Sequence, residues 1–267
     1  MSAVDAAAPS GTSVLVADRV TKEFGGLVAV NDVYLDVPRH SIVSLIGPNG
    51  AGKTTLFNML TGLYKPSAGR ILLGERDITH DRPDQITSLG VARTFQNIRL
   101  FAAMTAVENV MIGRHARMNT GVFGSIFRPP WVRNEEKAVR ARARELLRYV
   151  GLREDTLEQL AKNLSYGDQR RVEIARALAS EPSFMLLDEP FAGIDPLAIS
   201  DIREVIGYLK GRGIGILITD HNVRETLAIT DRAYILYDGK ILVAGTATEI
   251  AHNPVAREIY LGERFAL

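Results

Sequence analysis

One eight-residue segment constrains this chain more than any other feature: GPNGAGKT, Gly47–Thr54. It fits the pattern G-x-x-x-x-G-K-[ST] at every fixed position. The apolar run before it, Ile42–Ile46, is typical of a strand buried on both faces of a sheet, and Lys53–Gly62 is expected to form a helix. Strand, glycine-rich loop and helix in this order predict a loop that binds phosphate groups at a helix N-terminus.

The loop predicts binding of ATP together with Mg²⁺. Its glycines allow backbone N–H groups to converge on the β- and γ-phosphates. We expect Lys53 to neutralise phosphate charge, the Thr54 hydroxyl to coordinate Mg²⁺, and Thr55 to reach the α-phosphate. The residues expected to bind the nucleotide here are Gly47, Pro48, Asn49, Gly50, Ala51, Gly52, Lys53, Thr54 and Thr55.

Two carboxylates follow a second apolar run, Phe184–Leu187. In an open parallel sheet, ligands bind at the carboxyl ends of the strands, which is where Asp188 and Glu189 are expected to lie. We expect Asp188 to hold Mg²⁺ through water and Glu189 to polarise the attacking water as a general base. The pair therefore extends the prediction from ATP binding to ATP hydrolysis.

Composition excludes several other classes of function. The formal net charge is +1, from 32 basic and 31 acidic residues, which gives no global electrostatic case for binding nucleic acid or an anionic membrane. Cysteine is absent, which excludes disulfides and thiolate metal sites. No apolar run approaches the roughly 20 residues needed to span a bilayer. The small, polar residues 1–13 are expected to be a disordered tail.

The remaining sequence alternates between strand and helix patterns, except over about residues 98–164, where helical periodicity predominates. This predicts a mainly parallel sheet covered on both faces, with a helical insertion. The further strands are expected at Val14–Val20, Asn31–Val37, Ile214–Thr219, Ala233–Tyr237 and Lys240–Ala244. The further helices are expected at Ala106–Arg117, Asn134–Val150, Gln169–Ala179 and Ser200–Gly211.

Further motifs narrow the class, because kinases, GTPases and helicases also carry a phosphate loop and acidic strand end. The segment LSYGDQRR, Leu164–Arg171, resembles the LSGGQ signature of ATP-binding cassette (ABC) ATPases. Gln96 in RTFQN resembles the family's Q-loop, Gly193–Pro196 (GIDP) its D-loop, and His221 in ITDH its H-loop. Phe24 lies where the family stacks adenine. The motifs follow the family's order over about residues 14–245, and together they resemble an ABC ATPase.

The resemblance implies roles for individual residues. ABC ATPases dimerise head to tail, so Ser165 and Gly167 would contact the γ-phosphate held by the partner's loop. Gln96 would approach Mg²⁺ and the attacking water, and His221 would hold the γ-phosphate and that water in position. Asp195 would lie at the dimer interface. The family's fold would be an α/β P-loop NTPase core with a mainly parallel sheet, an N-terminal antiparallel β portion and a helical subdomain.

The same resemblance implies one ABC ATPase domain over residues 14–267. Residues 14–97 and 165–267 would form the α/β core, and residues 98–164 the helical subdomain. The signature departs from the consensus, with Tyr166 in place of glycine and Asp168 in place of glutamine. The serine and following glycine that would contact phosphate are retained, so the departure bears on rate rather than on ATP binding.

Two groups of transporters are similar to different parts of the chain. The importer ATPases for branched-chain amino acids, of the LivG type, are similar at Phe24–Val30, Val43–Phe57 and Ala92–Phe101. The lipopolysaccharide-export ATPases, of the LptB type, are similar at Asp188–Pro196, Leu217–Leu227 and Tyr260–Leu267. In ABC systems the membrane subunits dock beside the Q-loop and helical subdomain, here about Arg93–Val132. That surface belongs to the importer-like part, and we therefore favour the importer over the exporter.

The family implies partners and a location. We expect a second ABC ATPase subunit, identical or not, and separate integral membrane permease subunits. An importer would add a periplasmic or extracellular substrate-binding protein, and the chain would lie peripherally at the cytoplasmic face of the inner membrane. Soluble ABC ATPases of translation or DNA repair are the alternative of another class. They generally carry two cassettes or a long coiled coil, and neither pattern occurs here.

Two weaker patterns have open interpretations. The helix predicted by Lys137–Val150 is basic and amphipathic, and we favour a solvated face over contact with phospholipid. The segment Asn119–Val132 is rich in glycine, proline and aromatic residues. Its apolar side chains could dock a membrane partner or pack locally: Phe123, Ile126, Phe127 and Trp131.

Overall fold

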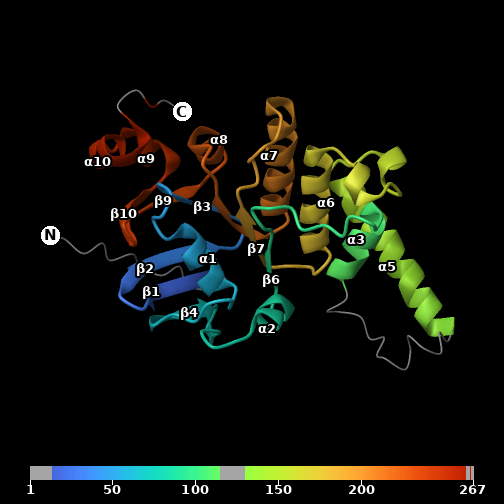
Figure 1. Cartoon of the computed structure of the whole chain (residues 1–267), viewed down its shortest axis with the longest axis horizontal. Coiled ribbons are helices and arrows are strands. Elements are labelled where there is room, and N and C mark those ends of the chain that lie inside the picture. Colours follow the sequence, from blue (N-terminus) through green and yellow to red (C-terminus); the bar gives the residue numbers. More distant parts are fainter. Residues whose placement is uncertain (1–13, 115–129, 263–264, 266–267) are drawn as a thin grey trace.

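The computed structural model describes residues 14–114, 130–262 and 265, and it contains two β-sheets (Figure 1). The N-terminal sheet is antiparallel, with the order β2-β1-β4-β5. The central sheet has the order β10-β9-β3-β8-β7-β6, in which the strands from β9 to β6 run parallel and β10 pairs antiparallel with β9. The N-terminal sheet consists of β1 (Val14–Phe24), β2 (Leu27–Pro38), β4 (Ala68–Leu73) and β5 (Arg76–Asp77). The central sheet consists of β3 (Ile42–Ile46), β6 (Val91–Arg93), β7 (Phe184–Asp188), β8 (Gly215–Thr219), β9 (Arg232–Tyr237) and β10 (Lys240–Gly245).

The central strands are continuous apolar runs because both faces of this sheet are covered. Every residue of β3, β7 and β8 is buried. Along β7, Phe184 and Leu186 pack into the core shared with the N-terminal sheet and α1 (Lys53–Leu60), while Met185 and Leu187 pack into the core on the helical side. The alternation of side chains along a strand thus divides one apolar run between two cores.

Helices cover the second core and extend it away from the sheet. Figure 1 shows α3 (Ala106–Gly113), α5 (Pro130–Tyr149) and α6 (Tyr166–Leu178) beside one another at the end distant from both termini. The local sequence starts two of them, since Thr105 and Ser165 each accept a backbone N–H in the first turn. The other α-helices among the described residues are α2 (Pro83–Ser88), α7 (Pro196–Gly211), α8 (Val223–Leu227), α9 (Ala247–His252) and α10 (Pro254–Ala256). None of the helices in the described part of the chain is long and apolar enough to cross a membrane.

The parallel strands bring four loops to one edge of the sheet. Four neighbouring strands lie side by side in the order β3, β8, β7 and β6. Their carboxyl ends are Ile46, Thr219, Asp188 and Arg93, respectively. The segments that follow these ends contain most of the predicted site residues. The fold therefore gathers residues that are up to about 170 positions apart in sequence.

Most predicted elements occur, with shifted ends. The helix predicted over Lys53–Gly62 ends at Leu60, and the one predicted over Ala106–Arg117 is described as far as Gly113. The helix predicted from Gln169 already begins at Tyr166, because Ser165 caps it. The predicted tail, residues 1–13, and most of the Asn119–Val132 segment, including Phe123, Ile126 and Phe127, lie outside the described residues.

Candidate active site

The phosphate loop leaves β3 at Gly47 and enters α1 after Gly52. Both glycines are required by close backbone approaches: a Cβ at Gly47 would lie 2.0 Å from the Leu236 carbonyl oxygen, and one at Gly52 would lie 2.4 Å from that of Ala29. Gly52 also has φ 103°, in the left-handed region that favours glycine. The loop therefore has the backbone geometry that the motif predicts, at the N-terminus of α1.

Lys53 is turned into this loop. Its Nζ donates to the carbonyl oxygens of Gly47 at 2.7 Å and Pro48 at 2.8 Å. Burial lowers the pKa of Lys53, and the negative charges of Glu189 and Asp188 oppose that shift. The electrostatic contact with both carboxylates brings the loop and the end of β7 into one site. Thr54 and Thr55 follow in the first turn of α1, with Thr54 exposed and Thr55 half-buried.

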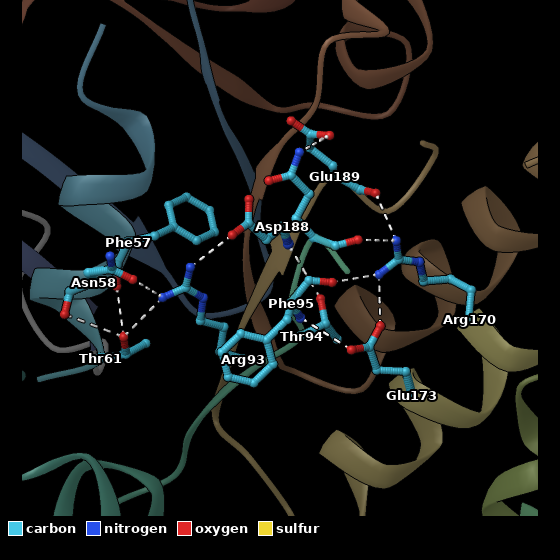
Figure 2. A network of polar contacts seen from close by, with 11 residues as sticks. Phe57, Asn58, Thr61, Arg93, Thr94, Phe95, Arg170, Glu173, Asp188 and Glu189 are labelled. Carbon is cyan, nitrogen blue, oxygen red and sulfur yellow. Dashed lines mark hydrogen bonds and ion pairs between the residues drawn. The ribbon is translucent and has the colours of Figure 1, made fainter. Parts of the chain in front are cut away.

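Asp188 forms a buried ion pair with Arg93, the last residue of β6 (Figure 2). Arg93 Nη2 lies 2.8 Å from Asp188 Oδ2, and the side chains are 8% and 7% exposed. Arg93 Nη1 donates to Asn58 Oδ1 at 2.6 Å, and the guanidinium lies between the rings of Phe57 and Phe95. The carboxylate predicted to hold Mg²⁺ is thus oriented by a cation from the neighbouring strand.

Glu189 is the point where three predicted catalytic residues meet. Gln96 Nε2 donates to Glu189 Oε2 at 3.0 Å, and His221 Nδ1 lies 3.5 Å from the same oxygen. Glu189 has φ 50°, a left-handed conformation that is rare outside glycine, and its N–H donates to the Thr219 carbonyl at 2.7 Å. The backbone at the end of β7 is therefore turned so that this carboxylate meets residues from the Q-loop and from the end of β8.

Asp220 supports the turn that carries His221. Its carboxylate accepts the backbone N–H groups of Phe191 and Asn222, each at 2.8 Å, and the residue is 1% exposed. Burial raises the pKa of Asp220, and the two backbone donors oppose the shift. His221 itself keeps a side chain that is 65% exposed, so it faces outward from a fixed turn.

Phe24 is available for a flat ligand. It is 40% exposed at the end of β1 and meets the ring of Tyr64 edge to face, with centroids 5.3 Å apart. Phe24 is therefore not part of the hydrophobic core. Its assignment to adenine stacking stays a prediction.

The signature residues lie apart from the phosphate loop. Ser165 caps α6 by accepting the Asp168 N–H at 3.1 Å, and its hydroxyl donates to the Asp168 carboxylate at 2.9 Å. Among the described residues, no hydrogen bond or ion pair joins Ser165 or Gly167 to the loop of the same chain. Tyr166 packs beside Gly193, and Asp195 lies exposed just before α7.

Comparison with known proteins decides the family. The profile described as "ABC transporter" matches residues 30–192. The chain belongs to the ABC transporter family. The match includes the phosphate loop, the Q-loop, the signature and the acidic pair. Similarity to solved ABC cassettes confirms the predicted P-loop NTPase fold of an ABC ATPase.

Relatives agree with this assignment over nearly the whole chain. The LivG branched-chain amino acid transport ATP-binding protein of Salmonella typhimurium is 43% identical over 251 residues, covering 94% of this chain and 98% of that protein. The lipopolysaccharide export ATP-binding protein LptB of Acidithiobacillus ferridurans is 43% identical over 256 residues, covering 96% and 100%. The ABC chain is therefore the ATP-binding and ATP-hydrolysing subunit of a transporter.

Solved ABC cassettes share its structure. An ATP-binding cassette in its ADP conformation aligns with TM-score 0.81 and 33% identity, over 95% of this chain and 100% of that one. A dimeric cassette in a post-hydrolysis state, bound to ADP and Pi, aligns with TM-score 0.74 and 27% identity, over 87% and 98%. The ABC chain accordingly binds nucleotide.

Sequence reasoning missed three charged residues beside the ABC site. Arg93 stands in the RTFQ segment, but the partner that gives it significance, Asp188, is on another strand. Arg170 and Glu173 are spaced i,i+3 among the buried residues of α6. The available signal was a pair of opposite charges on the apolar face of a predicted helix. Charged side chains are almost never fully buried unless they are paired, so this pattern indicates a buried ion pair.

Proposed function

We propose that this ABC ATPase powers the uptake of branched-chain amino acids or related small solutes through separate membrane subunits. Glu189 acts as the general base, accepting a proton from the water that attacks the γ-phosphate. Gln96 and His221, which both contact the Glu189 carboxylate, orient that base and the water. Lys53 neutralises phosphate charge at the start of α1.

Mg²⁺ would be held at this site together with the nucleotide. The described residues contain no group of three or more His, Cys, Asp or Glu side chains that could hold a metal alone. This fits Mg²⁺, which keeps several waters and is held by phosphates with one or two protein oxygens. Asp188, Thr54 and Gln96 would supply the protein ligands, directly or through water, and the ion would neutralise charge on the phosphates.

The site is completed by a second ATPase subunit, either another copy or a sister chain. Ser165 is exposed at the N-terminus of α6, and no hydrogen bond among the described residues joins it to the loop of its own chain. Its hydroxyl would exchange the Asp168 carboxylate for a phosphate held by a partner. The similarity to a dimeric cassette supports this arrangement. Asp195, exposed before α7, would lie in that interface.

A groove beside the Q-loop carries the assignment to an importer. It has a volume of 340 Å³ and lies between α2, β6, α3 and α6, lined by Ile86, Arg93, Phe95, Ile112 and Arg176 among others. In ABC systems the membrane subunits dock at this place. Arg93 and Phe95 come from the stretch that resembles LivG-type importers, so the substrate-related surface is importer-like. The chain would then lie peripherally at the cytoplasmic face of the inner membrane.

Co-purification and uptake test the proposal together. The tagged chain is expected to carry two polytopic membrane subunits from detergent-solubilised membranes, and vesicles containing the complex are expected to accumulate labelled leucine when ATP and a periplasmic binding protein are supplied. A Glu189→Gln complex is the matched control and should assemble without accumulating leucine. Assembly with membrane subunits that leave leucine outside and extract lipopolysaccharide would contradict the importer.

Lipopolysaccharide export is the second candidate. The LptB relative is as similar as LivG over a slightly longer alignment, and the C-terminal stretches of this chain resemble that type. Those stretches include Asp188–Pro196 and Leu217–Leu227, which contribute Glu189 and His221 to hydrolysis. Because all ABC transporters need these functions, their likeness carries less information about the substrate.

A further inference from the structure

Arg170 is a buried cation next to the catalytic edge of the sheet. Its side chain is 0% exposed and pairs at 2.7 Å with Glu173, which is 1% exposed and lies one turn further along α6. Arg170 Nε has no hydrogen-bond partner among the described residues. Apolar residues of similar volume often stabilise a core as well as a buried ion pair does. A contribution to folding stability therefore does not explain why Arg170 and Glu173 are buried here.

The remaining donors of Arg170 reach the backbone beside both candidate catalytic residues, as Figure 2 shows. Nη1 donates to the Phe95 carbonyl at 2.8 Å. Nη2 donates to the carbonyls of Gln96 at 3.1 Å and Glu189 at 3.3 Å. Because the guanidinium is planar and its donors have a fixed geometry, these carbonyls are held in fixed positions relative to one another.

Glu173 fixes the same segment from the other side. One carboxylate oxygen accepts from Arg170 and the other accepts the Phe95 N–H at 3.3 Å. The residue before Gln96 is thus held both at its N–H and at its carbonyl. Since Arg170 and Glu173 are both on α6, which begins at the signature residue Ser165, one helix connects the signature to the catalytic residues of the same chain.

Glu189 requires this support because its backbone is strained. A non-glycine residue at φ 50° persists only where its surroundings hold it. The Thr219 carbonyl accepts its N–H at 2.7 Å, and the Ala192 N–H donates to its carbonyl at 3.2 Å. Arg170 Nη2 is a second donor to the Glu189 carbonyl, and the same nitrogen also donates to the Gln96 carbonyl in the Q-loop.

We propose that Arg170, oriented by Glu173, is a positioning residue for ATP hydrolysis that sets the backbones of Gln96 and Glu189 relative to each other. This inference rests on the proposed roles of Gln96 and Glu189. Among the described residues, Arg170 donates to the Glu173 carboxylate and to three backbone carbonyls, none of them in the phosphate loop. Its loss therefore changes the geometry of the reacting groups while the loop that binds ATP stays intact. The effect is on kcat, with KM for ATP preserved.

The test compares three variants of the full chain in its transporter complex. Arg170→Met is expected to lower kcat by about 30- to 100-fold with KM for ATP within about twofold of wild type, because small displacements of reacting groups have effects of this size. Arg170→Lys keeps the charge but cannot bridge three carbonyls, so its kcat should be intermediate. The double variant Arg170→Met, Glu173→Leu removes both charges, and it should recover the melting temperature without recovering kcat.

A matched control separates positioning from general destabilisation. Tyr234 is a buried residue of β9 whose hydroxyl donates to the buried Asp36 carboxylate at 2.6 Å. Tyr234→Phe leaves Asp36 without this donor, so it should lower the melting temperature and leave kcat unchanged at temperatures where the variant is folded. A double variant at Arg170 and Glu173 with wild-type kcat would overturn the inference.

The Glu189→Gln variant, measured in parallel, separates a failure of the proposed positioning role from a failure of the proposed general base. If it is inactive while the double variant hydrolyses ATP at the wild-type rate, the positioning role is wrong and the proposed base stands. If Glu189→Gln itself hydrolyses ATP at the wild-type rate, the proposed base is wrong, and the positioning inference falls with it.

Discussion

The guanidinium of Arg93 lies 2.8 Å from the carboxylate of Asp188, and both side chains are more than nine-tenths buried. On one side, Asp188 lies at the carboxyl end of β7, on the same edge of the sheet as the phosphate loop that follows β3. The other side lines the groove beside the Q-loop. A single ion pair therefore connects the proposed Mg²⁺ site to the surface proposed for the membrane subunits.

Arg93→Met is expected to destabilise the nucleotide-free protein by about 3 kcal/mol, because it leaves a buried carboxylate without its cation. Mg·ADP should restore part of the loss, since the ion then supplies positive charge near Asp188. Urea denaturation with and without Mg·ADP measures both effects.

The partly exposed pair Arg114–Glu181 provides the control for Arg93. Arg114→Met should change stability by less than about 1 kcal/mol, as exposed pairs do. Equal effects of the two substitutions would show that the Arg93–Asp188 pair has no special role.

Lys53→Ala is expected to lower ATP affinity at least tenfold, because the only cation of the phosphate loop is removed. The structure of α1 should be preserved, since the hydrogen bonds of the Lys53 ammonium among the described residues go to the loop carbonyls of Gly47 and Pro48 and not to α1 itself. Titration with a fluorescent ATP analogue measures the affinity, and circular dichroism checks the fold. Unchanged affinity would remove Lys53 from the binding site.

Phe24→Ala should weaken ATP binding by about 1 to 2 kcal/mol without changing kcat, as expected for loss of a stacked base. Tyr208 is another exposed aromatic residue, on the surface of α7, so Tyr208→Ala is its control and should bind ATP normally. Isothermal titration calorimetry of the variants decides whether adenine stacks on Phe24.

Ser165→Ala is expected to impair ATP-dependent closure of the ATPase dimer and to leave binding by the single subunit within about threefold. The hydroxyl also caps α6, so a stability loss of about 1 kcal/mol is expected. Ser165→Asn retains a capping oxygen and can still donate to the Asp168 carboxylate, so it should fold well, but it lacks the hydroxyl and should still close poorly. Sizing with and without ATP, with both ATPase subunits present, measures closure.

The parts of the site that lie in one segment were predictable from the sequence. The strand Ile42–Ile46, the loop and the start of α1 occur where the motif predicts them, because each is determined by local backbone chemistry. Glu189, Gln96 and His221 were assigned separately by their motifs, and the structure brings their side chains together. The division into core and helical subdomain stays a prediction.

Contacts between distant segments were not predictable. β6 has only three residues, too few to show a periodicity, and was missed. Without it, nothing indicates that Arg93 meets Asp188, 95 positions away. The same reason applies to Arg170, since its acceptors come from the Q-loop and from the end of β7. The identities of these residues are local, but their partners are fixed only by the order of the strands.

The most direct test of the proposed hydrolysis mechanism is Mg·ATP turnover by Glu189→Gln in the assembled transporter. The groups that bind ATP remain in this variant, while the carboxylate that accepts the proton is lost. We predict tightly retained ATP and a rate of phosphate release at least about 100-fold below wild type, within the range for loss of a general base. Release of phosphate at the wild-type rate would contradict the assignment of Glu189 and the mechanism built on it.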